Sequence, residues 1–139
     1  MTMDKTLFQA ALQAALNSYS PYSKFRVGAA ILCADGSIVT GTNVENRSFG
    51  LTICAERSAL VAAISAGKRD FKAIAIATPD SDYPVSPCGA CRQVLSEFLH
   101  PDSMIRFGNT EQSYVTCTMA EIFPYDALHE LAEGNAKSS

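Results

Sequence analysis

The chain reads Cys54-Ala55-Glu56-Arg57 at one point and Pro87-Cys88-Gly89-Ala90-Cys91-Arg92-Gln93 at another. Each stretch places a cysteine at the start of an expected helix, where free backbone N–H groups and the helix dipole stabilise a thiolate. The two-residue gap between Cys88 and Cys91 is that of a metal chelate, and Cys54 offers a third sulfur from a facing helix. The two stretches therefore predict a metal site where two helices begin.

Apolar spacing and turn residues around these stretches predict the fold. Apolar residues recur at helical spacing near the N-terminus, Asp35-Gly36 is a strong hairpin signal, and Thr118 with Glu121 has the spacing of a capping box. The expected helices cover residues 4–18, 54–66 and 88–99, with a last short helix starting at Thr118, and the expected strands cover residues 27–32, 38–42, 73–77, 104–107 and 114–118. The order α-β-β-α-β-α-β-β-α predicts one α/β domain over residues 1–139, with a mixed five-stranded sheet sandwiched by helices.

Length, composition and charge restrict the partners that this chain can have. A chain of 139 residues, 47% of them apolar, can bury one hydrophobic core. The net charge is -3 and the eleven Lys and Arg are scattered, whereas binding a polynucleotide needs a clustered basic face. The sequence has no secretory signal pattern and no run of eighteen apolar residues. We therefore expect a cytoplasmic protein with a small-molecule substrate, no polynucleotide partner and no membrane partner.

The cysteines favour a catalytic zinc site over disulfides. Their number, five, is odd, and a chain without a signal sequence is expected in a reducing cytosol. Three thiolates leave one tetrahedral position of zinc open, as in catalytic sites, whereas a structural zinc takes a fourth ligand. The remaining candidates, none of which has chelate spacing to another, are Cys33, Cys117, His100 and His129. We therefore expect one zinc ion per chain, on Cys54, Cys88 and Cys91.

Charged side chains next to these cysteines suggest how the site works. Glu56 could take a proton from a zinc-bound water and later protonate the substrate. Zinc with three thiolates carries a net charge of -1, which opposes loss of that proton. We therefore predict that Arg57 and Arg92 offset the charge by hydrogen-bonding the sulfurs. The alternative is that both are solvated helix arginines.

Four motifs together resemble the cytidine deaminase family in its small homotetrameric form with three cysteine ligands. Besides the two stretches above, they are Tyr22-Ser23-Lys24-Phe25-Arg26-Val27-Gly28-Ala29-Ala30 and Asn43-Val44-Glu45-Asn46. The resemblance runs from about residue 20 to residue 93, and more loosely to residue 124. It implies a cytidine deaminase-like fold, zinc on the three cysteines, Glu56 as proton shuttle, and a homotetramer. The implied reaction is hydrolytic deamination of cytidine and deoxycytidine to uridine and deoxyuridine plus ammonia, in pyrimidine salvage.

The same resemblance implies how the substrate is held. Phe25 would pack beside it, Asn43 and Glu45 would hydrogen-bond the ribose hydroxyl, and the backbone around Ala55 would contact the base. An amide and a carboxylate two residues apart on an extended strand end share a face, which suits this role. From the residues alone, an ordinary turn with a solvated acid is the alternative.

Two regions depart from the family pattern. Phe49 stands where the family often has Tyr. Near the C-terminus, where an aromatic residue often reaches a neighbouring subunit's site, the candidates here are Tyr125 and Leu128.

Three other functions stay open on the sequence. A deaminase for another aminopyrimidine nucleoside, such as blasticidin S, would have the same cysteines, although residues 43–46 favour an ordinary nucleoside. A polynucleotide deaminase is disfavoured by the acidic charge. A zinc-stabilised binding module would have no use for Glu56. The residues do not rank cytidine against deoxycytidine.

Overall fold

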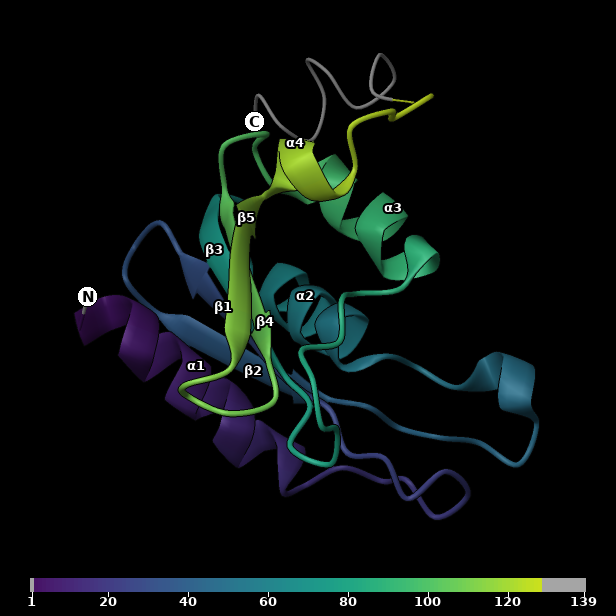
Figure 1. Cartoon of the computed structure of the whole chain (residues 1–139). Coiled ribbons are helices and arrows are strands. Elements are labelled where there is room, and N and C mark those ends of the chain that lie inside the picture. Colours follow the sequence, from purple (N-terminus) through teal and green to yellow (C-terminus); the bar gives the residue numbers. More distant parts are fainter. Residues whose placement is uncertain (1, 129–139) are drawn as a thin grey trace.

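The computed structural model describes residues 2–128, and Figure 1 shows its helices and strands in the order that the sequence predicts. His129, a candidate fourth zinc ligand, lies outside the described residues. The chain runs through α1 (Thr2–Ala15), β1 (Gly28–Cys33), β2 (Ile38–Thr42), the 3-10 turn η1 (Phe49–Leu51), α2 (Ala55–Ser65), β3 (Phe71–Ala77), α3 (Gly89–Phe98), β4 (Met104–Gly108), β5 (Tyr114–Thr118) and α4 (Met119–Ile122). The predicted capping box of Thr118 and Glu121 starts α4.

The five strands form one mixed sheet in the order β2-β1-β3-β4-β5, which confirms the predicted architecture. β1 runs antiparallel to both β2 and β3, and β4 runs antiparallel to β5. β3 and β4 are parallel, so the chain must cross over between them, and it does so through α3. The crossover begins at the carboxyl end of β3, where loops of α/β proteins commonly carry functional residues.

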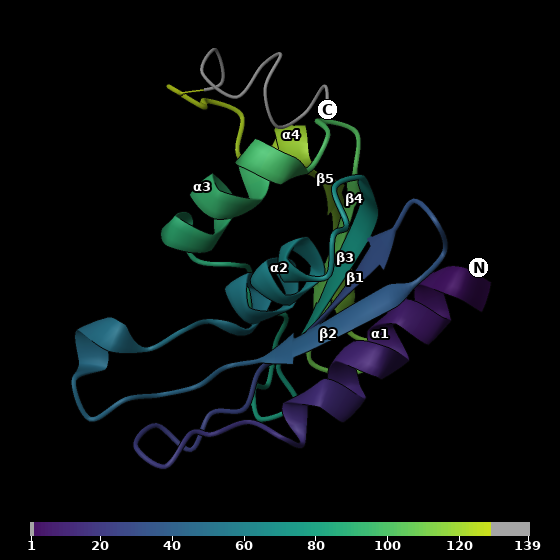
Figure 2. The ribbon, with the colours of Figure 1, turned by 180° about the vertical axis from the view of Figure 1, so that it is seen from behind.

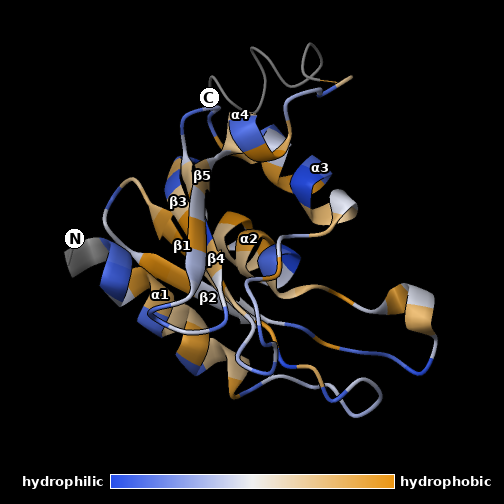
Figure 3. Ribbon diagram, viewed as in Figure 1, coloured by the Kyte–Doolittle hydropathy of each residue, from blue (hydrophilic) through white to orange (hydrophobic). Residues whose placement is uncertain are grey.

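Helices cover both faces of the sheet, as Figures 1 and 2 show from opposite sides. Small side chains on one face, among them Ala73, Ala75 and Ala77, pack against α1. Larger ones on the other face, among them Ile74 and Ile76, pack against α2 and α3. Figure 3 shows apolar residues in the sheet and also on the turn η1, which projects away from the core.

Glycine lets α2 lie directly against the sheet. A Cβ atom on Gly41 in β2 would lie 2.3 Å from the backbone nitrogen of Ala59 in α2, which is closer than any side chain allows. The helix is therefore positioned by backbone contact, and its first residues are held at a fixed place beside the sheet.

Several element ends differ from the prediction by one to three residues, and hydrogen bonds explain two of these differences. α1 ends at Ala15 and not at Ser18, because the next three N–H groups bond to carbonyls three residues back, a tighter 3-10 turn. β1 starts at Gly28 and not at Val27, because the N–H of Val27 is bonded by the side chain of Asn43. Within residues 2–128, no helix has the length and apolar character needed to cross a membrane.

Candidate active site

Three cysteine sulfurs lie together where α2 and α3 begin. Cys54 and Cys88 are the N-cap residues of these helices, and Cys91 lies in the first turn of α3. The Sγ atom of Cys88 lies 4.0 Å from that of Cys54 and 3.3 Å from that of Cys91, and all three lie within 4.8 Å of one another. A tetrahedral zinc with Zn–S bonds of about 2.3 Å spaces its sulfurs by about 3.8 Å, so the donor set fits zinc.

The cluster favours thiolate formation on Cys54. The pKa of Cys54 is lowered to about 5, chiefly by a hydrogen bond from Cys91 and also by Arg57. The pKa of Cys91 is raised, because its thiol donates to the Cys54 thiolate and because it is buried. One sulfur is thus charged at neutral pH even without a metal, ready to take up a cation.

Arg57 makes the predicted contact with the sulfurs. Its Nη2 atom donates to the Sγ atom of Cys54 at 3.4 Å, and this bond raises the pKa of Arg57. Its Nε atom is buried with no hydrogen-bond partner in the structure. The guanidinium therefore lies against the thiolate cluster as a fixed positive charge.

Arg92 does something else, and the prediction that it donates to the sulfurs is wrong. Its Nε atom donates to the carbonyl of Pro87 at 2.8 Å, Nη1 to the carbonyl of Ile122 at 2.8 Å, and Nη2 to Oγ of Ser86 at 3.0 Å. Helical side chains lean toward the helix N-terminus, which brings this guanidinium to the loop before α3. It fixes that loop and joins it to α4.

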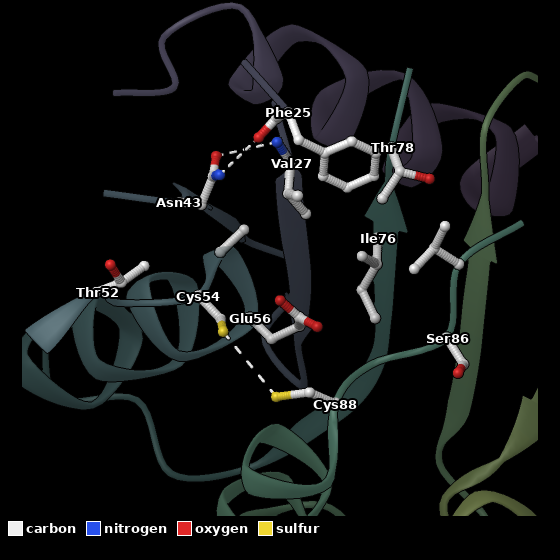
Figure 4. Close-up of a pocket in the computed structure, with 12 residues that line it drawn as sticks. Phe25, Val27, Asn43, Thr52, Cys54, Glu56, Ile76, Thr78, Ser86 and Cys88 are labelled. Carbon is white, nitrogen blue, oxygen red and sulfur yellow. Dashed lines mark hydrogen bonds between the residues drawn. The ribbon is translucent and has the colours of Figure 1, made fainter. Parts of the chain in front are cut away.

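A cavity of about 240 Å³ opens beside the sulfurs, and Figure 4 shows the side chains around it. It brings together six of the predicted site residues, which are Phe25, Asn43, Cys54, Ala55, Glu56 and Cys88. Sequence reasoning missed the residues after β3 that complete its lining, Thr78, Val85 and Ser86. Their position at the carboxyl end of a strand next to a parallel neighbour is the signal that could have found them.

Glu56 presents its carboxyl group to this cavity. The residue is only 5% exposed, and in Figure 4 its carboxyl group points into the space near the sulfurs of Cys54 and Cys88. Burial raises the pKa of Glu56 to about 7, and the nearby Cys54 thiolate adds to the shift. A carboxyl group with this pKa can both take up and release a proton near neutral pH.

The side chain of Asn43 is largely occupied by the chain itself. Its Oδ1 atom accepts from the N–H of Val27 at 3.0 Å and from the hydroxyl of Ser18, and its Nδ2 atom donates to the carbonyl of Phe25 at 2.9 Å. An amide nitrogen carries two hydrogens, so the second is the group that Asn43 can offer to a ligand in the cavity.

Glu45 lies in an adjoining cavity of about 280 Å³ and does not line the one with the sulfurs. Its carboxylate accepts from the N–H groups of Tyr22 and Ser23, at 3.0 and 3.2 Å, and from the hydroxyl of Ser23. These bonds, led by that of the hydroxyl, lower the pKa of Glu45. Thr52 lines both cavities and marks where they meet.

Comparison with known proteins assigns the family. A model described as "Cytidine and deoxycytidylate deaminase zinc-binding region" matches residues 1–106. The chain belongs to this family of deaminases. A cytidine deaminase of Halalkalibacterium halodurans is 48% identical to this deaminase over 118 residues, which are 85% of this chain and 89% of the relative. A blasticidin-S deaminase of Bacillus cereus is 35% identical over 109 residues, 73% of this chain and 76% of the relative.

Solved structures agree with the family assignment. The crystal structure of cytidine deaminase from Burkholderia pseudomallei superposes with a TM-score of 0.83 at 41% identity, covering 87% of this chain and 96% of that one. The predicted family, fold class and zinc cofactor of this deaminase are thereby confirmed, and the three-sulfur cluster is where its described residues can hold the metal.

Arg57→Ala is expected to weaken the site without unfolding the protein. Removing the fixed positive charge leaves the thiolate cluster unbalanced, and losing such an outer partner typically reduces metal affinity or activity ten- to a hundredfold. Zinc affinity measured by competition with a chelator, together with the rate of deamination, checks this. Arg57→Lys keeps the positive charge but loses the planar guanidinium, so its zinc affinity and rate should lie between those of the wild type and those of Arg57→Ala. Unchanged affinity and rate in Arg57→Ala would show that the arginine has no such role.

Proposed function

We propose that this deaminase hydrolyses free cytidine and deoxycytidine to uridine and deoxyuridine, with release of ammonia. The observation that carries the proposal is the buried carboxyl group of Glu56 in the cavity that Cys54 and Cys88 also line. Relatives that cover most of the chain are named cytidine deaminase, which supports this substrate. Incubation with cytidine, followed by the ultraviolet change to uridine and by measurement of ammonia, tests it.

The residues of the cavity divide the reaction between them. Zinc, held by Cys54, Cys88 and Cys91, would supply a Lewis acid that makes water a nucleophile at neutral pH. We assign to Glu56 the transfer of a proton from the attacking water to the ring nitrogen beside the reacting carbon. The same carboxyl group then takes the proton of the hydroxyl group that has been added to this carbon and delivers it to the amine, which leaves as ammonia while the carbonyl of the product forms. In the metal-free protein the pKa of this carboxyl group is about 7, in the range where a side chain both accepts and donates protons.

Other residues hold the pyrimidine base. Phe25, Val27 and Ile76 give the cavity an apolar lining that packs on a flat ring and excludes bulk water. Ala55 is the first residue of α2, so its N–H group has no partner within the helix and can donate to the base. The base would thus be held edge-on at the start of α2, close to Glu56.

We further propose that Asn43 and Glu45 recognise the sugar. Asn43 lies in the cavity with the sulfurs and Glu45 in the adjoining one, so a nucleoside bridging the two near Thr52 would place its sugar between them. The hydrogen bonds that both side chains make to residues 22–27 hold them ready for this contact.

Asn43→Ala is expected to lower kcat/KM for cytidine by about ten- to a hundredfold, the usual effect of one lost hydrogen bond to a substrate. Because Asn43 also holds Phe25 and Val27, the variant and the wild type are both assayed on 2′,3′-dideoxycytidine as well. This compound lacks the 2′- and 3′-hydroxyl groups of the sugar. If Asn43 acts on the sugar, the variant should distinguish the two substrates much less than wild type does. Equal discrimination in both enzymes would restrict Asn43 to holding the cavity wall.

We propose that the protein is a homotetramer. Tyr19, Val44 and Ile53 lie side by side in neighbouring extended segments, and all three are exposed. Val44 and Ile53 belong to a projection formed by residues 43–54, and Tyr19 lies beside it. At its tip, in the turn η1, Phe49 and Leu51 are 72% and 66% exposed. Contiguous exposed apolar surface of this kind is typical of a subunit interface. Light scattering tests the proposal, and an active monomer would contradict it.

The tetramer also gives the C-terminal residues a role. Tyr125 is 91% exposed and Leu128 is exposed as well, so either can reach a neighbouring subunit. We propose that one of them replaces the family's aromatic residue at the neighbour's site. Combined with the projection at 43–54, this puts each substrate cavity near a subunit boundary.

We propose a cytoplasmic role in pyrimidine salvage. The five cysteines are free, which suits a reducing compartment. A small neutral nucleoside, and not a polynucleotide, suits the net charge of -3. Because one relative is a blasticidin-S deaminase, blasticidin S is assayed beside cytidine, and we expect cytidine to be the better substrate.

A further inference from the structure

The segment of residues 22–27, which contributes one wall of the substrate cavity, has no regular secondary structure. Side chains hold its backbone where a neighbouring strand would otherwise do so. The carboxylate of Glu45 accepts hydrogen bonds from the backbone N–H groups of residues 22 and 23. The hydroxyl oxygen of Ser23 accepts one from the backbone N–H of Phe25, and the amide oxygen of Asn43 accepts one from the backbone N–H of Val27. The position of Phe25 therefore depends on a few named hydrogen bonds.

Arg26 makes the contact that joins this wall to the neighbouring wall, which the loop after β3 forms. Asp80 accepts the backbone N–H of Arg26 at 2.9 Å and its Nε atom at 3.0 Å, both on Oδ2. Its Oδ1 atom accepts from Nη2 at 2.7 Å. A guanidinium and a carboxylate joined by two parallel bonds, with a backbone bond added, have one preferred geometry.

Asp80 is itself anchored to the sheet. It lies in a turn that begins at Thr78, whose N–H donates to the carbonyl of Gly108 at the end of β4 at 2.9 Å. The turn closes through the N–H of Ser81 to the carbonyl of Thr78, and Asn109 donates to the carbonyl of Ser81 at 3.0 Å. The Arg26–Asp80 pair thus ties a loop without strand pairing to a fixed point.

The two walls that the pair connects face the same substrate. Phe25 and Val27 flank Arg26 in one wall, and Thr78, with Ser86 farther along the same loop, lines the other. We infer that the Arg26–Asp80 pair is a positioning element for substrate binding: by fixing Phe25 and Val27 relative to the loop after β3, it sets the affinity for the nucleoside. The inference rests on the proposed function, and it assigns no chemical step to either residue.

A positioning role predicts a particular kinetic pattern. Partly exposed ion pairs add little to global stability, so loss of the pair should leave folding almost unchanged. Glu56 and the cysteines are on other segments and keep their places, so kcat should change little. The wall formed by residues 25–27 should instead become less ordered, which raises the KM for cytidine.

Kinetics of Arg26 and Asp80 variants test the inference. We expect Asp80→Ala to raise KM about tenfold while kcat stays within about threefold, with Tm nearly constant. Asp80→Glu should restore much of the affinity because it returns a carboxylate. Arg26→Ala combined with Asp80→Ala should be little worse than Asp80→Ala alone, since the two residues act as one unit.

A second exposed ion pair serves as control. The Nζ atom of Lys68, which follows α2, lies 2.6 Å from Oδ2 of Asp35 in the turn between β1 and β2, and neither residue lines the substrate cavity. Asp35→Asn should therefore leave both KM and kcat unchanged. An equal rise of KM in Asp35→Asn would mean that surface charge in general, and not the wall, is responsible, and would overturn the inference.

The inference and the proposed function fail in different measurements. A wild-type enzyme that does not turn over cytidine would contradict the proposed function. An active wild-type enzyme whose Asp80→Ala variant keeps its KM would contradict the positioning role. Amide hydrogen exchange of residues 25–27 gives a readout that needs no substrate: it should accelerate in Asp80→Ala, and unchanged exchange would equally overturn the role.

Discussion

Glu56→Gln is expected to fold, bind zinc and bind nucleoside, yet to lose at least about a thousandfold in turnover. Each general acid–base transfer contributes roughly a hundred- to ten-thousandfold, and we assign more than one transfer to this carboxyl group. Glutamine has nearly the same shape but cannot carry the proton. Steady-state turnover, zinc content and binding of cytidine by calorimetry, measured on one preparation, separate the lost chemistry from lost binding.

Instability should not explain the loss in this variant. Burial raises the pKa of Glu56 from 4.5 to about 7. The folded, metal-free protein therefore holds this proton more tightly than the unfolded chain does, and the stability that the neutral carboxyl group gives the fold at low pH is lost as the pH rises through about 7. An amide is neutral at every pH and avoids this loss. Glu97→Gln, at an exposed position of α3, is the matched control and should remain fully active. Near-normal turnover in Glu56→Gln would refute the shuttle role, whereas loss of zinc would make Glu56 a ligand.

Cys88→Ala should have the second large effect, the joint loss of zinc, activity and stability. Its sulfur lies 4.0 Å from that of Cys54 and 3.3 Å from that of Cys91 and belongs to the donor set. Loss of a residue that only hydrogen-bonds a metal ligand typically reduces metal affinity ten- to a hundredfold, and loss of a ligand itself should reduce it more. Because metal binding is coupled to folding, Tm should fall with zinc content, and Cys54→Ala should behave alike. Metal analysis and thermal unfolding measure both.

A cysteine outside the cluster gives the control. Cys117 is partly buried in β5 and is not part of the three-sulfur group. Cys117→Ala should keep one zinc per chain and most of its activity. Full zinc content in Cys88→Ala would contradict the assigned ligand set.

Local sequence patterns predict the parts of this protein that depend on neighbours along the chain. The gap between Cys88 and Cys91, and the place of each cysteine at a helix start, follow from a few adjacent residues. The same holds for the Asp35-Gly36 turn, where Gly36 adopts a φ of +89°. To predict the order of helices and strands along the chain, the alternation of apolar runs and helical spacing is enough.

Contacts between distant segments could not be predicted in this way. Arg57 lies three residues after Cys54 and Arg92 directly after Cys91, but only the folded chain shows that the carbonyl of Ile122 accepts a hydrogen bond from Arg92. Glu45 is bonded by residues 22 positions away or more, and Arg26 meets Asp80 across 54 positions. No periodicity in the sequence records such distances.

The Gly41 contact distinguishes two parts of the cavity, one held by direct backbone contact and one held by side-chain hydrogen bonds. Because α2 rests on the backbone of β2 at Gly41, the helix cannot move closer to the sheet, and a side chain at this position would push it, with Cys54 and Glu56 at its start, out of place. The segments 22–27 and 78–86, which line the cavity together with the start of α2, are held by side-chain hydrogen bonds that single substitutions can remove or change. A laboratory that wants this enzyme to accept bulkier nucleoside drugs should therefore build its libraries in those two loops and leave α2 untouched.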